Sequence, residues 1–304
     1  MKRNTKRIVE FRFYEKPMKE PVLALMGTDW IRDFGEDITC LHFHNLMEIG
    51  YCVWGKGEII LNKGTYHYEK GTFTLIPHNI LHGTNSERNC HWEYLFFDVE
   101  DIVKEQYKDN QEKVEKIITS IVKNGKIYKK DIEPYLCSLI QTIFELMKNK
   151  KKYYKETIKG ILYAIAMQLA AENEETDYEI GSVSVIAPAL TYIAKHYAED
   201  IRIQNMAACC HLSETHFRRV FHEDMNMTPI EYVNLVRVQR ACDMMKKGND
   251  HMEEVAVKVG YQTISTFNRN FRKIIGMSPY QWKKKSDQEN EKIGDYHISA
   301  KKGW

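Results

Sequence analysis

The sequence of 304 residues predicts a multidomain α+β protein, in which a small N-terminal β-barrel precedes a helical middle segment and an all-α C-terminal domain. Three observations support this fold class. Aromatic and β-branched residues occur in short runs from 22 to 98, apolar residues recur at helical spacing from 101 to 180, and a stretch repeats itself within 186–286. At roughly 100–200 residues per domain, the length agrees with two or three domains.

Residues 1–100 are predicted to form the barrel. Runs such as EIGYCVW, GEIILN, FTLIP and WEYLFFDV follow one another with Gly and Asn between them. A spacing of about ten residues between such runs indicates strands joined by tight turns. This texture is typical of a small barrel or a jelly-roll-like sandwich.

Residues 101–180 are predicted to be helical. Two apolar stripes, at 117–122 and 139–147, have the i, i+3, i+4 spacing of amphipathic helices. Such stripes have two interpretations, a surface through which two chains dimerise or packing against the barrel. We favour a dimerisation segment, followed by a polar linker at 172–184.

The strongest signal is an internal repeat in the C-terminal third. Residues 217–229 read FRRVFHEDMNMTP and residues 267–279 read FNRNFRKIIGMSP, so that the Phe and Arg positions match. Upstream, MAACCHLSETHF resembles VAVKVGYQTISTF, with one extra residue in the second copy. Each copy has the pattern of two short helices joined by a tight turn. Ser213 can cap the second helix of the first copy, and Gly260 suits the positive φ of the turn in the second.

The second helix of each copy has the composition of a helix that reads the DNA major groove. Phe217 and Phe221, like Phe267 and Phe271, recur on one face that must be buried. The outward faces then carry Arg, Asn, Ser and Thr, of which Arg can pair with guanine and Asn with adenine. The alternative is a pair of solvated hairpins, and the matched arginines of the two copies argue against it.

A continuous helix is predicted between the copies. Pro229 suits its first turn, residues 230–247 contain no helix breaker, and Gly248 with Asn249 ends it. At ~1.5 Å per residue this rod spans roughly 27 Å, so the two reading helices could lie about one DNA turn, ~34 Å, apart. The charge agrees, because residues 186–285 hold 15 Lys and Arg against 10 Asp and Glu.

Residues 186–285 resemble the DNA-binding domain of the AraC/XylS family of bacterial transcription regulators. The resemblance rests on the two helix pairs, the spacer Pro229-x-x-Tyr232-x4-Arg237 and the closing stretch GMSP at 276–279. It implies a double helix-turn-helix domain on double-stranded DNA. The residues that it places against the bases are Thr215, Arg218, Arg219, Ile264, Ser265, Asn268 and Arg269. Ile264 departs from the pattern, since it can touch a thymine methyl group but cannot donate a hydrogen bond.

A group of histidines in the barrel region is the second candidate site. In the pattern His42-x-His44-x3-Glu48, the two histidines lie on the same face of a strand. If that face lines the interior, Glu48 and His82 can converge on them. Three imidazoles with one carboxylate could hold Zn²⁺, Fe²⁺, Mn²⁺ or Ni²⁺.

The spacing of these groups resembles both halves of the cupin motif, with Asn79 where the second half usually has glycine. Three interpretations stay open: a metal-dependent enzyme, a sensory pocket for a small polar effector, and a core whose polar groups only satisfy one another. We favour the pocket, and assign it no cofactor and no metal. Trp30 and Trp54 could stack on the apolar face of a sugar while the His and Glu side chains bind its hydroxyls. Aromatic residues are also common as the core of small barrels.

Several functional classes are disfavoured. The sequence lacks the patterns GxSxG, GxxxxGK[ST], GxGxxG and HExxH. No apolar run reaches the ~18–20 residues that cross a bilayer, and the basic N-terminus is not followed by the apolar segment of a signal peptide. The seven cysteines show no CxxC spacing and are typical of a reducing cytosol. We therefore expect a cytoplasmic protein that is not an enzyme and has no membrane contact.

These features predict a ligand-responsive transcription regulator. We expect a homodimer whose barrel binds a sugar or related metabolite and which, by the family resemblance, contacts RNA polymerase as an activator. The alternatives are a cupin metalloenzyme that uses His42, His44, Glu48 and His82, and a DNA-binding protein whose barrel is only structural. The tail at 287–304 is polar and has no predicted role.

Overall fold

The computed structural model describes residues 8–14, 16–17, 20–35, 40–61, 64–78, 80–107, 110–122, 124–176, 185–225, 227–247, 251–289 and 298–300. The chain divides into two compact units. The first unit is Met1–Ile180 with Tyr296–Ile298, and the second is Gly181–Asp295 with Ser299–Trp304. Segment 101–180 therefore lies within the first unit.

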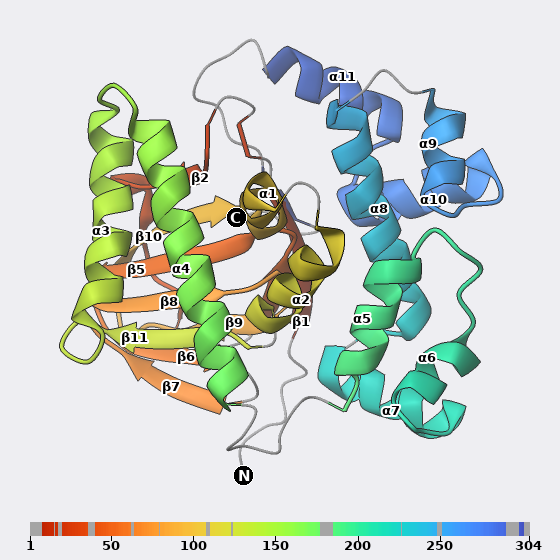
Figure 1. Cartoon of the computed structure of the whole chain (residues 1–304), viewed down its shortest axis with the longest axis horizontal. Helices are drawn as coiled ribbons and strands as arrows, with labels where there is room; N and C mark the ends of the chain where they lie inside the picture. The colour runs from red at the N-terminus through yellow and green to blue at the C-terminus, as the bar shows by residue number, and fades with distance from the viewer. Residues whose placement is uncertain are drawn as a thin grey trace. The chain divides into compact units, whose positions relative to one another are not determined.

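Two β-sheets form the strand-rich part of the first unit (Figure 1). One sheet has the strand order β12-β1-β4-β9-β6-β7, and the other has the order β11-β8-β5-β10-β2, with β3 paired to β10. The strands are β1 (Ile8–Tyr14), β2 (Leu23–Leu25), β3 (Ile31–Arg32), β4 (Cys40–His44), β5 (Met47–Trp54), β6 (Gly57–Leu61), β7 (Gly64–Tyr68), β8 (Thr72–Ile76), β9 (His82–Thr84), β10 (Cys90–Phe97), β11 (Lys126–Lys129) and β12 (Ile298–Ala300). The β-rich N-terminal domain predicted from the sequence is confirmed.

Alternation along the strands gives the second sheet two apolar faces. On β5, Met47 and Ile49 join the core shared with the helices, whereas Cys52 joins a separate core with Trp92 of β10. Successive residues of a strand point to opposite faces. Glu48 therefore lies on the same face of β5 as Cys52. This face points between the two sheets, so the Glu48 carboxylate is buried there.

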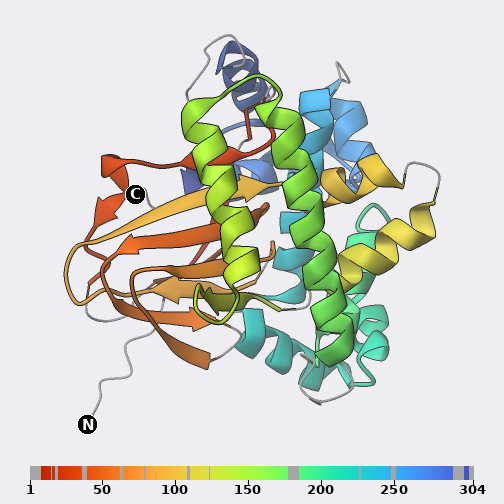
Figure 2. The same ribbon diagram turned by 60° about the vertical axis from the view of Figure 1, so that its left-hand side comes forward.

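Four helices cover the outer face of the second sheet: α1 (Val99–Gln106), α2 (Gln111–Ile121), α3 (Pro134–Asn149) and α4 (Tyr154–Thr176). Figures 1 and 2 show α3 and α4 side by side over this sheet. Ile140, Ile143 and Phe144 of α3 are buried in one core with Ile49 and Phe73 of the strands. The apolar stripes thus pack against the sheet, and they no longer argue for a dimer contact.

The expectation that 101–180 is entirely helical is corrected by β11, which pairs antiparallel with β8. Its four residues, KIYK, are too short and too basic to give a strand pattern, and pairing with β8 supplies the backbone partners that make them a strand.

The second unit is all-helical. Its helices are α5 (Ala187–His196), α6 (Ile203–Cys209), α7 (Glu214–Met225), α8 (Pro229–Lys247), α9 (Met252–Lys258), α10 (Ile264–Ile275) and α11 (Pro279–Glu289). The predicted helix between the copies is α8, and Gly248 and Asn249 lie outside the described residues. The predicted polar tail begins within α11 and includes β12, and its other residues also lie outside the described part.

Across the described residues, no helix combines the length and the hydropathy needed to cross a membrane.

Candidate functional sites

Two helix pairs, α6–α7 and α9–α10, repeat one local geometry. The Leu212 amide donates to Ala207 O at 3.0 Å in the first turn, and the Tyr261 amide donates to Ala256 O at 2.9 Å in the second. The residue before each donor has a positive φ, 54° at His211 and 92° at Gly260. The predicted turns are therefore built alike, although only one of them uses glycine.

Side-chain caps start the second helix of each pair. The Ser213 hydroxyl accepts from the His216 amide at 3.4 Å, and the Thr263 hydroxyl accepts from the Thr266 amide at 3.2 Å. Each bond satisfies one of the amides that the first turn of a helix leaves without a partner. The Ser213 cap is evident from the sequence, whereas Thr263 requires the insertion in the second copy to be placed correctly.

The buried faces of α7 and α10 match residue for residue. Phe217, Phe221 and Met225 are buried on α7, and Phe267, Phe271 and Ile275 are buried on α10. Burial of one face leaves the opposite face of each helix to solvent. Six of the seven proposed base-facing residues are exposed there, namely Thr215, Arg218, Arg219, Ser265, Asn268 and Arg269. Ile264, at the start of α10, is half-buried.

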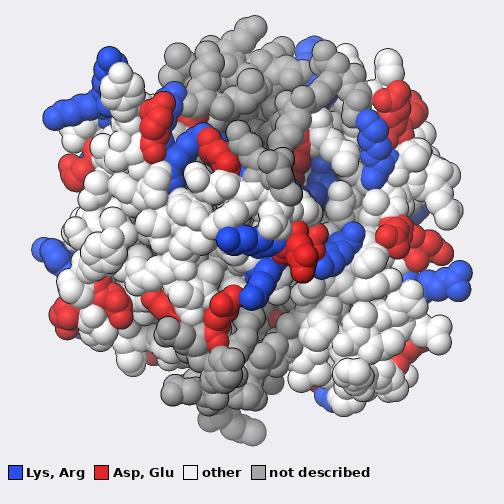
Figure 3. Space-filling view, viewed as in Figure 1, with Lys and Arg blue, Asp and Glu red and all other residues white. Residues whose placement is uncertain are grey.

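The outer faces of the two helices differ in charge. Arg219 of α7 forms an ion pair with Glu223 at 2.7 Å, four residues further along. On α10 the position that corresponds to Glu223 is occupied by Lys273, which is paired with Glu231 of α8 at 3.1 Å. Figure 3 shows basic and acidic side chains interspersed on the face that it presents. Of the two helices, α10 is the more basic, so a polyanion would be attracted to it more strongly.

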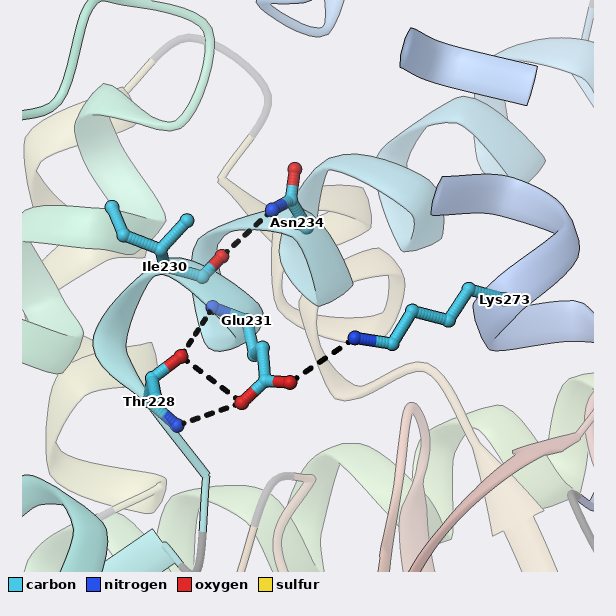
Figure 4. Close-up of polar contacts among 5 residues, drawn as sticks. All are labelled: Thr228, Ile230, Glu231, Asn234 and Lys273. Carbon is cyan, nitrogen blue, oxygen red and sulfur yellow. Dashed lines mark hydrogen bonds and ion pairs between the residues drawn. The ribbon is translucent and has the colours of Figure 1, made fainter. Parts of the chain in front are cut away.

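A capping box begins α8 (Figure 4). The Thr228 amide donates to Glu231 Oε2 at 3.0 Å, and the Glu231 amide donates to the Thr228 hydroxyl at 3.3 Å. Sequence reasoning missed this feature, although Thr-x-x-Glu is its signature. The repeat contains it twice, because Ser278 and Gln281 make the same bonds at the start of α11.

Glu231 also joins α8 to α10 through Lys273 (Figure 4). The backbone bond from Thr228 lowers the pKa of Glu231, partial burial opposes this shift, and Lys273 lowers the pKa further. Glu231 is thus ionised at neutral pH and connects the rod to the second helix pair.

Replacing Thr228 with alanine is expected to destabilise the start of α8 by about 1 kcal/mol, because a helix N-cap is lost. Thr228→Ser keeps the hydroxyl and should leave the stability nearly unchanged. Glu231→Gln keeps the acceptor and removes only a half-exposed ion pair, so its cost should be smaller. Hydrogen exchange of the first turns of α8 measures the effect. Equal protection in the Ala and Ser variants would contradict it.

Arg237 of α8 contacts the loop that leads into the first helix pair and the turn of the second. Its guanidinium donates to Tyr197 O at 2.7 Å and to Glu199 O at 2.8 Å, in the loop before α6. The same group lies 5.4 Å from the ring centre of Tyr261, in the turn of the second pair. Bonds from a planar guanidinium fix direction as well as distance. Arg237 is therefore placed to keep the two helix pairs in a constant arrangement.

The histidine cluster lies between the two sheets of the first unit. His42 of β4 and His82 of β9 are direct cross-strand partners, with ring centres 4.1 Å apart. The ring of His44 lies 5.0 Å from that of His82. Cross-strand partners point to the same face of a sheet, and His44 is two residues from His42. The sequence therefore placed all three imidazoles on one side correctly.

A tight turn brings Glu48 to the imidazoles from the other sheet. Only Asn45 and Leu46 separate β4 from β5, so His44 and Glu48 face each other across the corner. His44 Nε2 lies 3.2 Å and His82 Nε2 lies 3.8 Å from Glu48 Oε2. Asn45 is held by Tyr14 of β1, with bonds of 2.8 Å and 3.0 Å to the Tyr14 backbone.

The surroundings favour the ionised form of Glu48 and the neutral forms of His42 and His44. Burial alone would raise the pKa of Glu48, but contacts with His44 and His82 outweigh burial and lower the pKa to about 2. Burial lowers the pKa of His44, although Glu48 opposes that shift. Burial, Arg12 and the other two imidazoles lower the pKa of His42 well below its ordinary value.

The cluster has the composition of a metal-binding site. One ligand atom from each of His42, Glu48 and His82 lies within 4.8 Å of the others. Neutral imidazoles and an ionised carboxylate are the forms that bind a divalent ion.

Of the two tryptophans expected beside the cluster, Trp30 lies in the apolar cluster that also holds the ring partners of His44. Trp30 is buried in a small apolar cluster with Tyr14 and Phe96. The rings of Tyr14 and Phe96 contact the ring of His44, with centres 5.7 Å and 5.4 Å away. The position of Phe96 could be predicted from the alternating pattern of its strand. The contact of Tyr14 with His44 could not, because it depends on the pairing of β1 with β4.

The assignment of Trp54 to the effector site is corrected by the strand register. Trp54 is 39% exposed at the end of β5 and stands opposite His91. An irregularity separates this pair from the pair Trp92 and Cys52, which face the interior. A single extra residue reverses the side to which a strand residue points. Trp54 therefore lies off the face of Glu48.

The comparisons with known proteins match both units. A sequence model of the AraC-like ligand binding domain matches residues 36–166, and a model of a helix-turn-helix domain matches residues 206–285. The uncharacterized HTH-type transcriptional regulator YfiF of Bacillus subtilis is 24% identical over 251 residues, which cover 79% of this chain and 77% of that protein.

A second relative is the Msm operon regulatory protein of Streptococcus mutans, 20% identical over 240 residues, 78% of this chain and 83% of that one. Among solved structures, ToxT from Vibrio cholerae with a bound unsaturated fatty acid gives a TM-score of 0.42. The identity is 12%, and the alignment covers 86% of this chain and 93% of that chain.

Proposed function

The chain belongs to the AraC family of DNA-binding transcription regulators, and on that premise we propose that it activates transcription when a small molecule binds between its two sheets. The observation that carries the proposal is the repeated helix pair. Two copies bury the same face and expose Arg, Asn, Ser and Thr on the other. That composition suits the donor and acceptor groups of the major groove.

We propose that α7 and α10 enter successive major grooves on one side of the duplex. Arg218 and Arg219 would contact bases or phosphates from α7, and Ser265, Asn268 and Arg269 would do so from α10. Arg237 supports this arrangement, because one side chain contacts both the loop that leads into the first helix pair and the turn of the second. Ile264 would contribute an apolar contact.

The effector in this proposal is a sugar or related metabolite whose hydroxyl groups meet His42, His44, Glu48 and His82. The affinity for this effector must differ between two arrangements of the dimer, because a ligand that binds both arrangements equally does not shift the equilibrium between them. In this proposal the protein is a homodimer that acts in the cytoplasm and contacts RNA polymerase. The support for these partners is family membership.

The competing hypothesis is a metalloenzyme built on the same four residues. The AraC-like ligand binding domain and the regulator names of the relatives favour the regulator. A protein that binds DNA through a purely structural barrel is the other alternative, and it predicts no effector.

Selection of bound sequences from a random duplex library tests the DNA half of the proposal. The full-length protein at ~150 mM salt should enrich a motif with two elements about 10 bp apart, one helical turn. A library that shows no enriched sequence would favour the metalloenzyme.

A panel of sugars and related metabolites tests the other half. The correct compound should raise the unfolding temperature of the full-length protein, because a ligand of the folded state stabilises it by mass action. It should also change the affinity for the selected DNA. A compound that raises the unfolding temperature but leaves DNA binding unchanged would count against signalling.

A further inference from the structure

The two recognition helices, α7 and α10, differ in net charge although their buried faces match. Two arginines and three carboxylates lie on α7, whereas α10 has two arginines, a lysine and no carboxylate. A DNA duplex attracts cationic side chains and repels carboxylates along its whole length. The two helices therefore cannot contribute equally to binding.

One position of the repeat carries most of the difference. On α7 the carboxylate of Glu223 lies 2.7 Å from a guanidinium nitrogen of Arg219, and both side chains are more than half exposed. The counterparts on α10 are Lys273 and Arg269. Lys273 pairs instead with Glu231 of α8 (Figure 4), and Arg269 has no carboxylate partner among the described residues. Arg219 is thus engaged within its own helix, and Arg269 is available to a ligand.

The stability of α7 does not explain the glutamate. Glu223 lies in the last turn of α7, which ends at Met225. The carboxyl end of a helix has a negative partial charge that favours cations and disfavours carboxylates. An arginine four residues before a glutamate is also the weaker order of such a pair. The matching turn of α10 has Arg272 and Lys273, the favourable choice.

The pair of Arg219 and Glu223 lies on the face of α7 that DNA would meet. Phe217 and Phe221 are buried, and at about 3.6 residues per turn Arg219 and Glu223 lie on the opposite side of the helix. A duplex that reaches Arg219 therefore also comes close to Glu223. Charges within ~8–10 Å of each other are not fully screened by salt. Arg219 must exchange the carboxylate for a phosphate or a base before it contributes to binding.

We propose that Glu223 competes with DNA for Arg219, so that α10 supplies most of the affinity and α7 binds its element of the motif more weakly. Glu223 is then a positioning residue that acts through Arg219. The proposal rests on the proposed function, because it concerns the DNA that α7 and α10 contact. Removal of Glu223 should strengthen binding, which is the opposite of the effect of removing a direct contact.

The test measures binding of the full-length protein to duplexes with both elements of the selected motif, with either element alone, or with random sequence. The element whose preference is lost in Arg269→Ala belongs to α10. We expect the wild type to bind this element alone more tightly than the other element alone. The reverse order would contradict the unequal roles of the two helices.

Glu223→Gln should tighten binding to the complete motif roughly two- to fivefold, the strength of an exposed ion pair. It should also steepen the salt dependence by about one unit. Glu223→Lys, which supplies the charge found at this place on α10, should tighten binding further. Glu112→Gln is the matched control, because it removes the same charge from an exposed position on α2 of the first unit. Its affinity should equal that of the wild type.

A double-mutant cycle separates competition for Arg219 from a general effect of charge. Arg219→Ala should weaken binding more in the Glu223→Gln background than in the wild type, since only there is the guanidinium free for DNA. The unfolding temperature of Glu223→Gln should be equal to or above that of the wild type, because the lost carboxylate opposes the helix dipole. Equal costs of Arg219→Ala in the two backgrounds would overturn the proposal.

The outcome is separable from that of the proposed function. If the protein selects a motif but Glu223→Gln binds it no more tightly than the wild type, the regulator stands and this inference fails. If no motif is selected, the proposed function fails. Random duplex then decides the inference, which requires Glu223→Gln to bind it more tightly than the wild type.

Discussion

Replacing Arg269 with alanine is expected to weaken binding to the selected DNA motif by about 1–3 kcal/mol, roughly five- to a hundredfold, if its guanidinium reads a base. Arg269 is exposed on α10, the more basic of the two recognition helices. The loss arises because the base edge and the guanidinium each lose a directed partner in a desolvated groove. Binding titrations at several salt concentrations, on the motif and on random duplex, measure it.

The matched control is Arg272→Ala, which removes the same charge from the same exposed helix outside the base-facing set. It should weaken binding to both duplexes equally and reduce the salt slope by about one unit. Arg218→Ala on α7 should behave like Arg269→Ala. If Arg269→Ala instead weakened both duplexes equally, Arg269 would be a phosphate contact, and base reading by α10 would rest on Asn268 and Ser265.

Replacing Gly260 with alanine is expected to destabilise the C-terminal unit by about 2–5 kcal/mol, since a strained backbone and a steric clash add together. The φ of Gly260 is +92°, which favours glycine. A Cβ atom there would lie 2.7 Å from Ala198 O and 2.9 Å from Ala198 Cα, both backbone atoms. Hydrogen exchange of α8 and α10 peptides gives the free energy of opening.

Gly276→Ala is the control, because Gly276 has a similar φ of +88° but open space around its Cα. It should cost about 1–2 kcal/mol, the conformational part alone. Equal costs for the two variants would show that the contact with Ala198 is unimportant. Ala198 lies between the two residues whose carbonyls accept from Arg237. Gly260→Ala should therefore also weaken binding to a two-part motif more than to a single element.

The C-terminal half could be predicted in detail from the sequence. The repeat revealed two helix pairs and the helix between them, because a buried helical face requires apolar residues at fixed spacing. Phe217, Phe221 and their counterparts are buried as expected. The junction at Arg237 could not be predicted, since its partners are carbonyls about 40 residues away. Backbone carbonyls have no signature in a sequence.

In the N-terminal half, the sequence predicted less of the site and the tertiary structure added more. By itself, the sequence determined that this protein has a β-rich domain, two helix pairs and a set of histidines and a glutamate on strand residues of one parity, because such periodicities follow from local geometry. Only the tertiary structure decided that β1 brings Tyr14 to His44, that β11 belongs to a sheet, and that Trp54 points away from Glu48. Strand pairing joins residues far apart in the chain, and a shift of one residue reverses which face a side chain occupies.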